Sequence, residues 1–161
     1  MATLPQLIED DIRVLDDALQ EFLTQTSASV AMVIDKGGFL ITHQGEAGDV
    51  DLTTLGALAS GAFLASQTIA GLVSEKNFNS TYQQGEKYSL LCTDIDEHCL
   101  LLVLFKSQSG AGLVKYYCGN CTSRIARQLI TAQERTPDGG FDLSVLNVAQ
   151  PRELFRKKVK T

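Results

Sequence analysis

The sharpest chemical pattern in this sequence is a pair of cysteines two residues apart, Cys118-Gly-Asn-Cys121. A Cys-x-x-Cys pair can act as a redox dithiol or supply half of a metal site. Together with Cys92 and Cys99, it gives the chain four thiols, which is the number that a structural zinc ion needs. These four cysteines are therefore the candidate metal or redox residues of the sequence.

The positions of the cysteines favour a different interpretation. A redox pair normally opens a helix, where the helix dipole lowers the thiol pKa. Cys118 and Cys121 instead fall on the apolar side of an expected helix, inside it rather than at its start. Cys92 and Cys99 are also further apart than the cysteines of a zinc knuckle. Because free cysteine is among the most buried residue types, we expect core or interface thiols, with zinc binding and redox activity as the alternatives.

A glycine-containing segment, Ser109-Gly110-Ala111-Gly112, stands where a phosphate-binding loop belongs, between a strand and a helix. The dinucleotide fingerprint needs a third glycine at a position that is Lys115 here, and the chain contains neither Gly-Lys-Ser nor Gly-Lys-Thr. We therefore interpret the segment as a turn before a helix, and we expect no cofactor.

The remaining ionisable residues form no catalytic pattern. His43 and His98 are the only histidines, and neither has an adjacent cysteine or serine in a known catalytic arrangement. Asp94, Asp96 and Glu97 cluster in an expected hairpin turn. Paired carboxylates can perform acid–base chemistry, but three acids in a turn are usually solvated turn formers. The sequence thus favours a binding module and not an enzyme.

Hydrophobic periodicity predicts the elements that position these residues. Apolar residues spaced three and four apart from Ile8 to Phe22 predict a helix, with Thr3 as its N-cap and an end near Gln25. Two β-prone runs around a glycine pair, 29–35 and 39–45, predict a hairpin. The later patterns predict a helix, three strands and a last helix, over 52–75, 78–84, 87–94, 98–106 and 113–134.

The segment 56–72, GALASGAFLASQTIAGL, is uncharged and built from unusually small residues. Ala57, Gly61 and Ala65 recur every four residues, so they form one stripe along the helix. Small residues let another backbone come close, and we expect a second copy of the chain to pack on this stripe. The alternative is that the stripe lies tightly on its own sheet. Three larger side chains are expected to point elsewhere and pack on the sheet: Phe63, Leu64 and Ile69.

The strand over 78–84 supports the same dimer. An exposed edge strand is a template for further pairing. Thr81, Gln83 and Gln84 would keep such an edge soluble while leaving its backbone free to join a partner's edge. We therefore place the dimer interface on the small-residue stripe together with Thr81 and Gln83, and we expect a proline at Thr81 to block the pairing.

The composition limits the class of protein. The chain has 161 residues, 44% of them hydrophobic, and a net charge of −5, which favours one globular domain and argues against nucleic acid as a partner. We expect a domain over 1–134 and a basic-tipped tail over 135–161, partly disordered or docked, after a Thr-Pro-Asp-Gly-Gly linker.

The N-terminal residues and the small-residue segment suggest a location. Five acidic residues lie within positions 1–20: Glu9, Asp10, Asp11, Asp16 and Asp17. A signal peptide would be basic and then apolar there, so we expect a cytoplasmic protein. We also expect no membrane insertion. A span needs about 20 predominantly apolar residues, and Ser60, Ser66, Gln67 and Thr68 interrupt the segment 56–72.

Four segments occur in an order and spacing that can be compared with known families. They are SVAMVIDKGGFLI, LGALASGAFLASQTIAGL, FNSTYQQGEKYSLLCTDI and HCLLLVLFKSQSGAGLVKYY. In order, they correspond to the first hairpin, the small-residue helix, the polar strand with the strand that follows it, and the last strand with the start of the last helix. Together they resemble the Roadblock family (dynein light chain, Roadblock type). The resemblance covers about residues 5–134.

The resemblance implies an α+β sandwich of the profilin-like, Roadblock type, with the element order α-β-β-α-β-β-β-α. Its five-stranded antiparallel sheet carries the first and last helices on one face and the small-residue helix on the other. Proteins of this family form homodimers or heterodimers whose sheets join edge to edge and whose middle helices pack together. Many are scaffolds or regulators of Ras-like small GTPases. One is a bacterial gliding-motility polarity regulator that accelerates GTP hydrolysis by holding the switch regions of its partner.

The sequence therefore predicts a non-catalytic homodimeric scaffold that binds a Ras-like small GTPase and modulates its nucleotide state. The alternatives are a zinc or redox protein that depends on the Cys-x-x-Cys pair, and an architectural subunit that pairs with another protein of the same fold. Arg124 and Arg127 could act as an inserted arginine finger, but they lie on a helix expected to face away from the middle helix.

Overall fold

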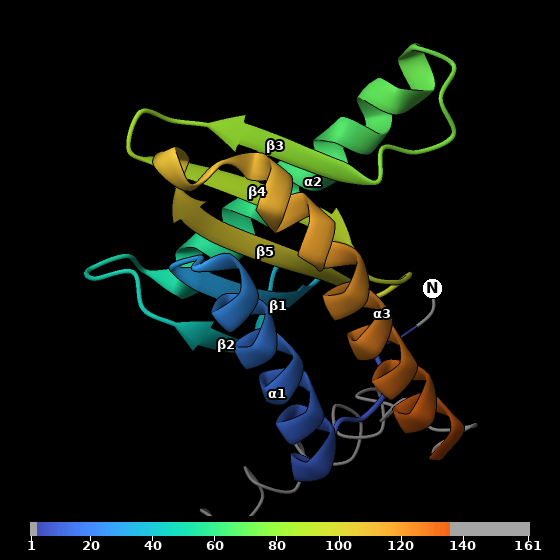
Figure 1. Ribbon diagram of the computed structural model, residues 1–161. Coiled ribbons are helices and arrows are strands. Elements are labelled where there is room, and N and C mark those ends of the chain that lie inside the picture. Colours follow the sequence, from blue (N-terminus) through green and yellow to red (C-terminus); the bar gives the residue numbers. More distant parts are fainter. Residues whose placement is uncertain (1–2, 136–161) are drawn as a thin grey trace, which may run out of the picture.

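Figure 1 shows the computed structural model, which describes residues 3–135. Helices and strands follow one another in the order predicted from the sequence. Their bounds are α1 Glu9–Thr26, β1 Val30–Asp35, β2 Leu40–Gly45, α2 Leu52–Leu72, β3 Ser80–Gln84, β4 Tyr88–Asp94, β5 Cys99–Lys106, the 3-10 turn η1 Ser107–Ser109 and α3 Ala111–Arg135. The predicted tail lies outside the described residues, apart from Arg135, which ends α3.

The strands form one five-stranded antiparallel sheet in the order β2-β1-β5-β4-β3. The central strand β5 is apolar along nearly its whole length, because helices cover both faces of the sheet there. Helices α1 and α3 lie on one face and α2 lies on the other (Figure 1). The predicted fold class is confirmed.

Two apolar clusters hold these layers together. Alternate residues of a strand point to opposite faces, so β5 sends Leu101 and Phe105 toward α1 and α3, and Leu100 and Leu102 toward α2. We call the two groups the α1–α3 cluster and the α2 cluster. The α1–α3 cluster is larger, because two helices cover that face of the sheet and one covers the other.

Helix α1 begins later than the sequence predicts. Thr3 lies outside the helix, whose first residue is Glu9. The free N–H of Ile8 is bound instead by the Asp11 carboxylate, at 2.8 Å. The predicted Thr3 cap is therefore wrong, because an acid three residues after Ile8 meets the requirement for an acceptor at the helix start.

The same Asp11 carboxylate joins the start of α1 to the end of α3. It is fully buried and accepts hydrogen bonds from Gln128 at 2.7 Å and from two guanidinium nitrogens of Arg135 at 2.8 and 2.9 Å. These bonds, those of Arg135 above all, hold the pKa of Asp11 well below its usual range, although burial alone would raise it. An ion pair therefore fixes the two helices together at this end.

Helix α2 is attached to the sheet along one narrow side. The Asp51 carboxylate caps its first turn by accepting the backbone N–H of Thr54. Near the start of α2, a Cβ on Gly56 would lie 3.1 Å from Cγ2 of Ile34, so the helix backbone there rests directly on the sheet. Near its end, the Gln67 amide donates to the Phe78 carbonyl at 2.8 Å and accepts the Phe78 N–H at 3.1 Å. Most other residues of α2 are exposed and have few partners in the described part of the chain.

Candidate protein-binding face

The small-residue stripe of α2 faces away from the sheet. Ala57, Gly61 and Ala65 are all exposed, and a Cβ built on Gly61 meets nothing within 4 Å. The alternative, in which the stripe packs tightly on its own sheet, is therefore wrong for Gly61 and Ala65. Ala57 lies against the β1–β2 turn, where a Cβ on Gly38 would be 3.1 Å from the Cα of Ala57. The glycine that does approach the sheet closely is Gly56, one position before Ala57.

Large apolar side chains also lie on the outer side of α2. Phe63 is 2% exposed and packs on the sheet as predicted, but Leu64 and Ile69 are 48% and 52% exposed, so their predicted orientation is wrong. Leu58 and Leu72, which no sequence pattern singles out, are 69% and 82% exposed. Because nearly every residue of α2 is apolar or small, its periodicity does not reveal which side faces the sheet.

The composition of α2 sets it apart from an ordinary surface helix. It has no charged residue, and by length and mean hydropathy, 1.4, it is long and apolar enough to cross a membrane, so the expectation that its polar residues make it too polar for a span is wrong. The polar residues that prompted that expectation are uncharged, and the surrounding leucine, isoleucine and alanine outweigh them. Two of these polar side chains hold α2 in the fold, since Ser60 donates to the Lys36 carbonyl at 2.9 Å and Gln67 is bonded to Phe78. An exposed apolar helix face of this extent marks an interaction surface.

Strand β3 lies at the edge of the sheet beside this helix face. The bonds at its two ends show how its backbone is oriented. The Asp94 N–H donates to the Asn79 carbonyl at 2.9 Å, and the Gly85 N–H donates to the Tyr88 carbonyl at 3.0 Å. Because bonded and non-bonded pairs alternate in an antiparallel ladder, every second residue between these ends bonds to β4.

The backbone groups of Thr81 and Gln83 therefore point inward, to β4, and those of Ser80, Tyr82 and Gln84 point to the open edge. The prediction that a proline at Thr81 would test edge pairing is thus wrong, because that proline would break the β3–β4 ladder within the chain. The assignment could not be made from sequence, since it depends on the register of β3 against β4.

The side chains of Thr81 and Gln83 nevertheless lie on the same side of the sheet as α2. They stand opposite Cys92 and Leu90, and both of these residues pack in the α2 cluster. The outer side of α2 and the adjoining side of β3 therefore form one continuous face, which we call the α2–β3 face.

The structure does not bring the four cysteines together. Cys92 lies in the α2 cluster, whereas Cys99, Cys118 and Cys121 lie in the α1–α3 cluster on the other side of the sheet. All four are buried, and this burial raises the pKa of each thiol to about 12. Within residues 3–135, no group of three or more metal-ligating side chains is formed. The expectation that these are core thiols is confirmed.

The other chemical candidates have structural roles or stand alone. Asp96 accepts the backbone N–H groups of His98 and Cys99 at 2.8 and 2.9 Å, so it closes the β4–β5 turn. Asp94 pairs with Lys36 at 2.8 Å. His43 is exposed on β2, at the opposite edge of the sheet from β3. The structure therefore brings no acid, base and nucleophile together among these residues.

The segment Ser109-Gly110-Ala111-Gly112 is a turn, as predicted. Ser109 ends η1, and Gly110 has a positive φ of 77°, a conformation that glycine adopts without strain, before α3 begins at Ala111. Arg124 of α3 pairs with Glu21 of α1 at 2.8 Å, on the side of the sheet away from α2.

A sheet with two helices on one face and a single apolar helix on the other defines an α+β sandwich of the profilin-like class, here with an exposed face suited to another protein. The Roadblock/LC7 domain profile matches residues 14–105 of the chain. This chain belongs to the Roadblock/LC7 domain family.

Solved structures agree with this assignment. A gliding protein, MglB, from Thermus thermophilus superposes with a TM-score of 0.75 at 28% identity, over 81% of this chain and 99% of that one. A structure described as MglB with a tetrameric arrangement gives a TM-score of 0.74 at 28% identity, over 82% and 98%. An uncharacterized protein of Methanocaldococcus jannaschii is 30% identical over 111 residues, which cover 69% of this chain and 96% of that protein.

Proposed function

We propose that this chain forms a homodimer through the α2–β3 face. The single observation that carries the proposal is the outer side of α2, where Gly61 has open space above it and Leu58 is 69% exposed in a helix without charge. Burying such side chains is worth about 25 cal/mol for each Å² of apolar surface removed from water. The adjoining β3 edge supplies the backbone groups of Ser80, Tyr82 and Gln84, which point away from β4, for a ladder between copies.

We further propose that this dimer is a cytoplasmic platform for a Ras-like small GTPase. The support is membership of the Roadblock/LC7 family and similarity to a gliding protein, MglB. A platform that binds the GTP-bound switch conformation more tightly than the GDP-bound one shifts the GTPase toward it. If it also positions the attacking water, it accelerates hydrolysis through orientation alone.

The mechanism that fits this chain uses no catalytic side chain of its own. Arg124 is paired with Glu21 on the face opposite α2, and a GTPase seated near α2 would not reach it. Within the described residues, the α2 helix itself offers apolar contact and no charge. Regulation would therefore come from differential binding of the two nucleotide states.

The experiment is a binding measurement with a purified Ras-like GTPase of the same organism, loaded either with GDP or with a non-hydrolysable GTP analogue. The wild-type chain should bind one nucleotide state at least tenfold more tightly, which corresponds to about 1.4 kcal/mol. Equal affinity for both states, or no binding, would rule out a role in setting the nucleotide state. Pairing with a different protein of the same fold would then support the architectural alternative.

A further inference from the structure

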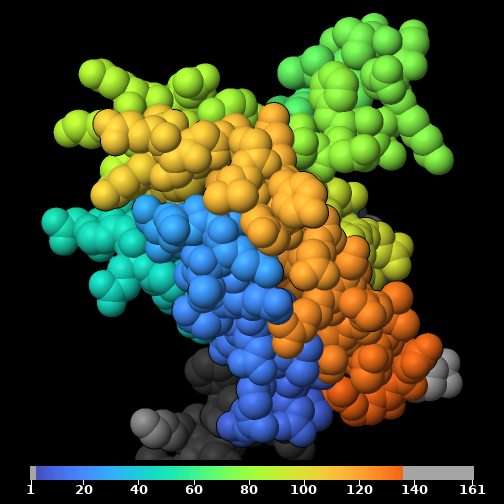
Figure 2. Space-filling model, viewed as in Figure 1, coloured from blue at the N-terminus to red at the C-terminus, as the bar shows by residue number. Residues whose placement is uncertain are grey.

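The end of α2 extends beyond the sheet. Figures 1 and 2 show it, with the loop to β3, as a projection that stands clear of the body beside the edge strand. Ile69, Leu72 and Val73 on this projection are 52%, 82% and 58% exposed, and all residues over 71–77 are exposed. Three large apolar side chains gathered on one projection favour contact with another surface.

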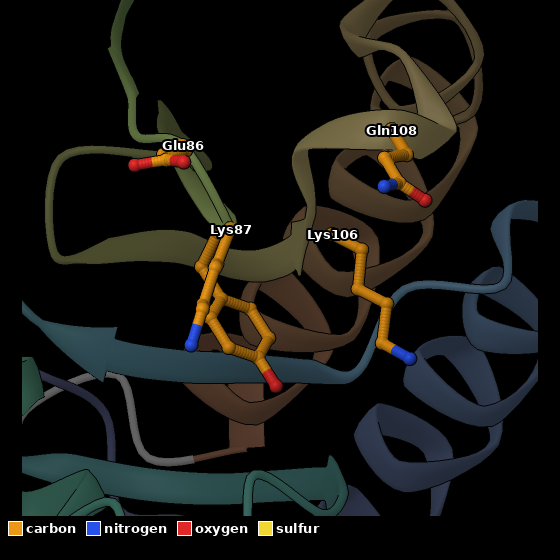
Figure 3. Close-up of a pocket in the computed structure, with 5 residues that line it drawn as sticks. Glu86, Lys87, Lys106 and Gln108 are labelled. Atoms are coloured by element: carbon orange, nitrogen blue, oxygen red, sulfur yellow. The ribbon is translucent and has the colours of Figure 1, made fainter.

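A hollow of ≈ 420 Å³ lies at the other end of β3 and is lined by Glu86, Lys87, Tyr88, Lys106 and Gln108. In Figure 3, Lys87 and Lys106 extend from neighbouring segments to the same side, and Glu86 is turned away from both. Neither lysine forms an ion pair with any residue in the described range 3–135. The hollow is therefore a basic site in a chain of negative net charge.

The hollow opens on the same side of the sheet as α2. Tyr88 and Lys106 are paired across β4 and β5, and each is two residues from a leucine, Leu90 or Leu104, that packs in the α2 cluster. Residues two apart on a strand share a face. The chain's own α2 does not reach this place, because its last turns are bonded to Phe78, before the start of β3.

Symmetry relates the projection to the hollow. If the β3 edges of two copies pair antiparallel in one continuous sheet, the two-fold axis is perpendicular to that sheet. The start of β3 in one copy then lies beside the end of β3 in the other. The projection, which stands by the start of β3, is thereby carried over the partner's sheet at the end of β3, where the hollow lies.

We propose that, in the homodimer, the projecting end of α2 from each copy docks in the lysine-lined hollow of the other. This inference rests on the proposed dimer and specifies its outer contacts. The charges are complementary, because a helix C-terminus is partially negative and the last turn of α2 has no basic residue of its own. Glu75 and Lys76, both exposed, follow three and four residues after the helix end and offset each other, so Lys87 and Lys106 meet the partial negative charge of the helix C-terminus itself. Tyr88 and the lysine stems cover Leu72 and Val73.

Cross-linking between variants that each carry one added surface cysteine tests the contact. Equal amounts of Leu72→Cys and tagged Tyr88→Cys proteins are mixed, allowed to exchange subunits and treated briefly with a short bismaleimide. The native cysteines are buried and should not compete. The matched control replaces Tyr88→Cys by Ser123→Cys, an exposed position on the α3 side. We expect a covalent 72–88 dimer in several-fold excess over the 72–123 product.

A charge-reversal measurement completes the test. The double variant Lys87→Glu/Lys106→Glu should weaken dimerisation roughly tenfold, because two favourable interactions with a helix end become repulsive. Arg127→Glu, on exposed α3 surface, should leave the dimer constant unchanged. A stable dimer without excess 72–88 product would overturn the docking contact and leave the proposed dimer standing. A wild-type monomer would overturn both.

Discussion

The four thiols show how burial controls the chemistry of individual residues. Since only the thiolate is nucleophilic, and burial raises the pKa of each thiol to about 12, we expect the folded protein at pH 8 to react very slowly with a chromogenic thiol reagent. All four thiols should react after unfolding in denaturant. A fast-reacting Cys118 in the native protein would contradict this prediction and revive the redox alternative.

Asp11 is the residue whose replacement should cost the most stability among the charged groups that join α1 to α3. In Asp11→Asn, the neutral amide cannot form the charge-assisted bonds to Arg135 and Gln128, so the free energy of unfolding should fall by about 1.5–3 kcal/mol at pH 7. Asp17→Asn is the control, because Asp17 is exposed on the same helix and its replacement should change stability by less than about 0.5 kcal/mol. Denaturant titration measures both variants.

The pH dependence of the Asp11 contribution has a definite sign. The pKa of Asp11 is lowered in the folded state, so its contribution is fully present above the ordinary aspartate value of about 3.9 and is lost as the pH falls below it. The difference in stability between wild type and Asp11→Asn should therefore be nearly constant from pH 6 to pH 5 and then shrink as acidification continues to pH 3, with the remainder lost only at still lower pH, where Asp11 is protonated in the folded state as well. A difference that stayed constant or grew would show that the ion pair with Arg135 does not stabilise the fold.

At the scale of the element, two glycines provide a matched test of the helix faces. A Cβ on Gly61 of α2 or on Gly119 of α3 meets nothing within 4 Å, so leucine fits at either position and should raise helix propensity by about 1 kcal/mol. We expect Gly61→Leu to separate the α2 helices of two copies and weaken dimerisation by at least tenfold. Gly119→Leu should leave the dimer intact, as measured by light scattering over a dilution series. Equal dimer constants for the two variants would place the interface away from Gly61.

Neighbouring positions of β3 provide the corresponding test of the edge. Gln84→Pro removes a backbone donor that points to the open edge, so the monomer should fold normally and dimerise more weakly. Thr81→Pro removes a donor that bonds to β4, so it should lower the thermal midpoint of unfolding itself. Circular dichroism and light scattering separate the two effects. If Gln84→Pro retained the wild-type dimer constant, joining of β3 edges would be excluded.

The elements show which features sequence patterns can predict. The order and type of every helix and strand followed from periodicity, because α1, α3 and the strands have one apolar side or a continuous apolar run. Helix α2 was located correctly, but the directions of Leu64 and Ile69 were not, since its composition is nearly uniform around the axis. The start of α1 was missed because Ile8, which precedes the helix, has no capping side chain, and its N–H is bound by Asp11 from inside the first turn.

The candidate face was less predictable than the elements that form it. The stripe of Ala57, Gly61 and Ala65 was identified from spacing alone and is exposed in the structure. The lysine-lined hollow had no sequence signal, because Lys87 and Lys106 are distant in the chain and meet only through the β4–β5 register. Which β3 residues offer free backbone groups likewise depends on pairing across strands, and no local pattern records it.

At the scale of the whole molecule, the two sides of the sheet differ in kind. One side is completed within the chain, where α1 and α3 cover the sheet and are joined by the bonds of Asp11 and Arg135. The other side is covered by a single helix whose outer surface is apolar and uncharged. A chain that completes one layer and leaves the other open is well suited to assemble through the open layer.

Self-association through α2 is the property on which the GTPase platform and the docked helix ends both depend. The most direct measurement is the solution mass of the full chain at micromolar concentration, by light scattering coupled to size-exclusion chromatography. We predict twice the chain mass of 17.5 kDa, with a shift toward the monomer in Gly61→Leu. A wild-type mass of 17.5 kDa, with the apolar side of α2 left open to water, would contradict the proposal.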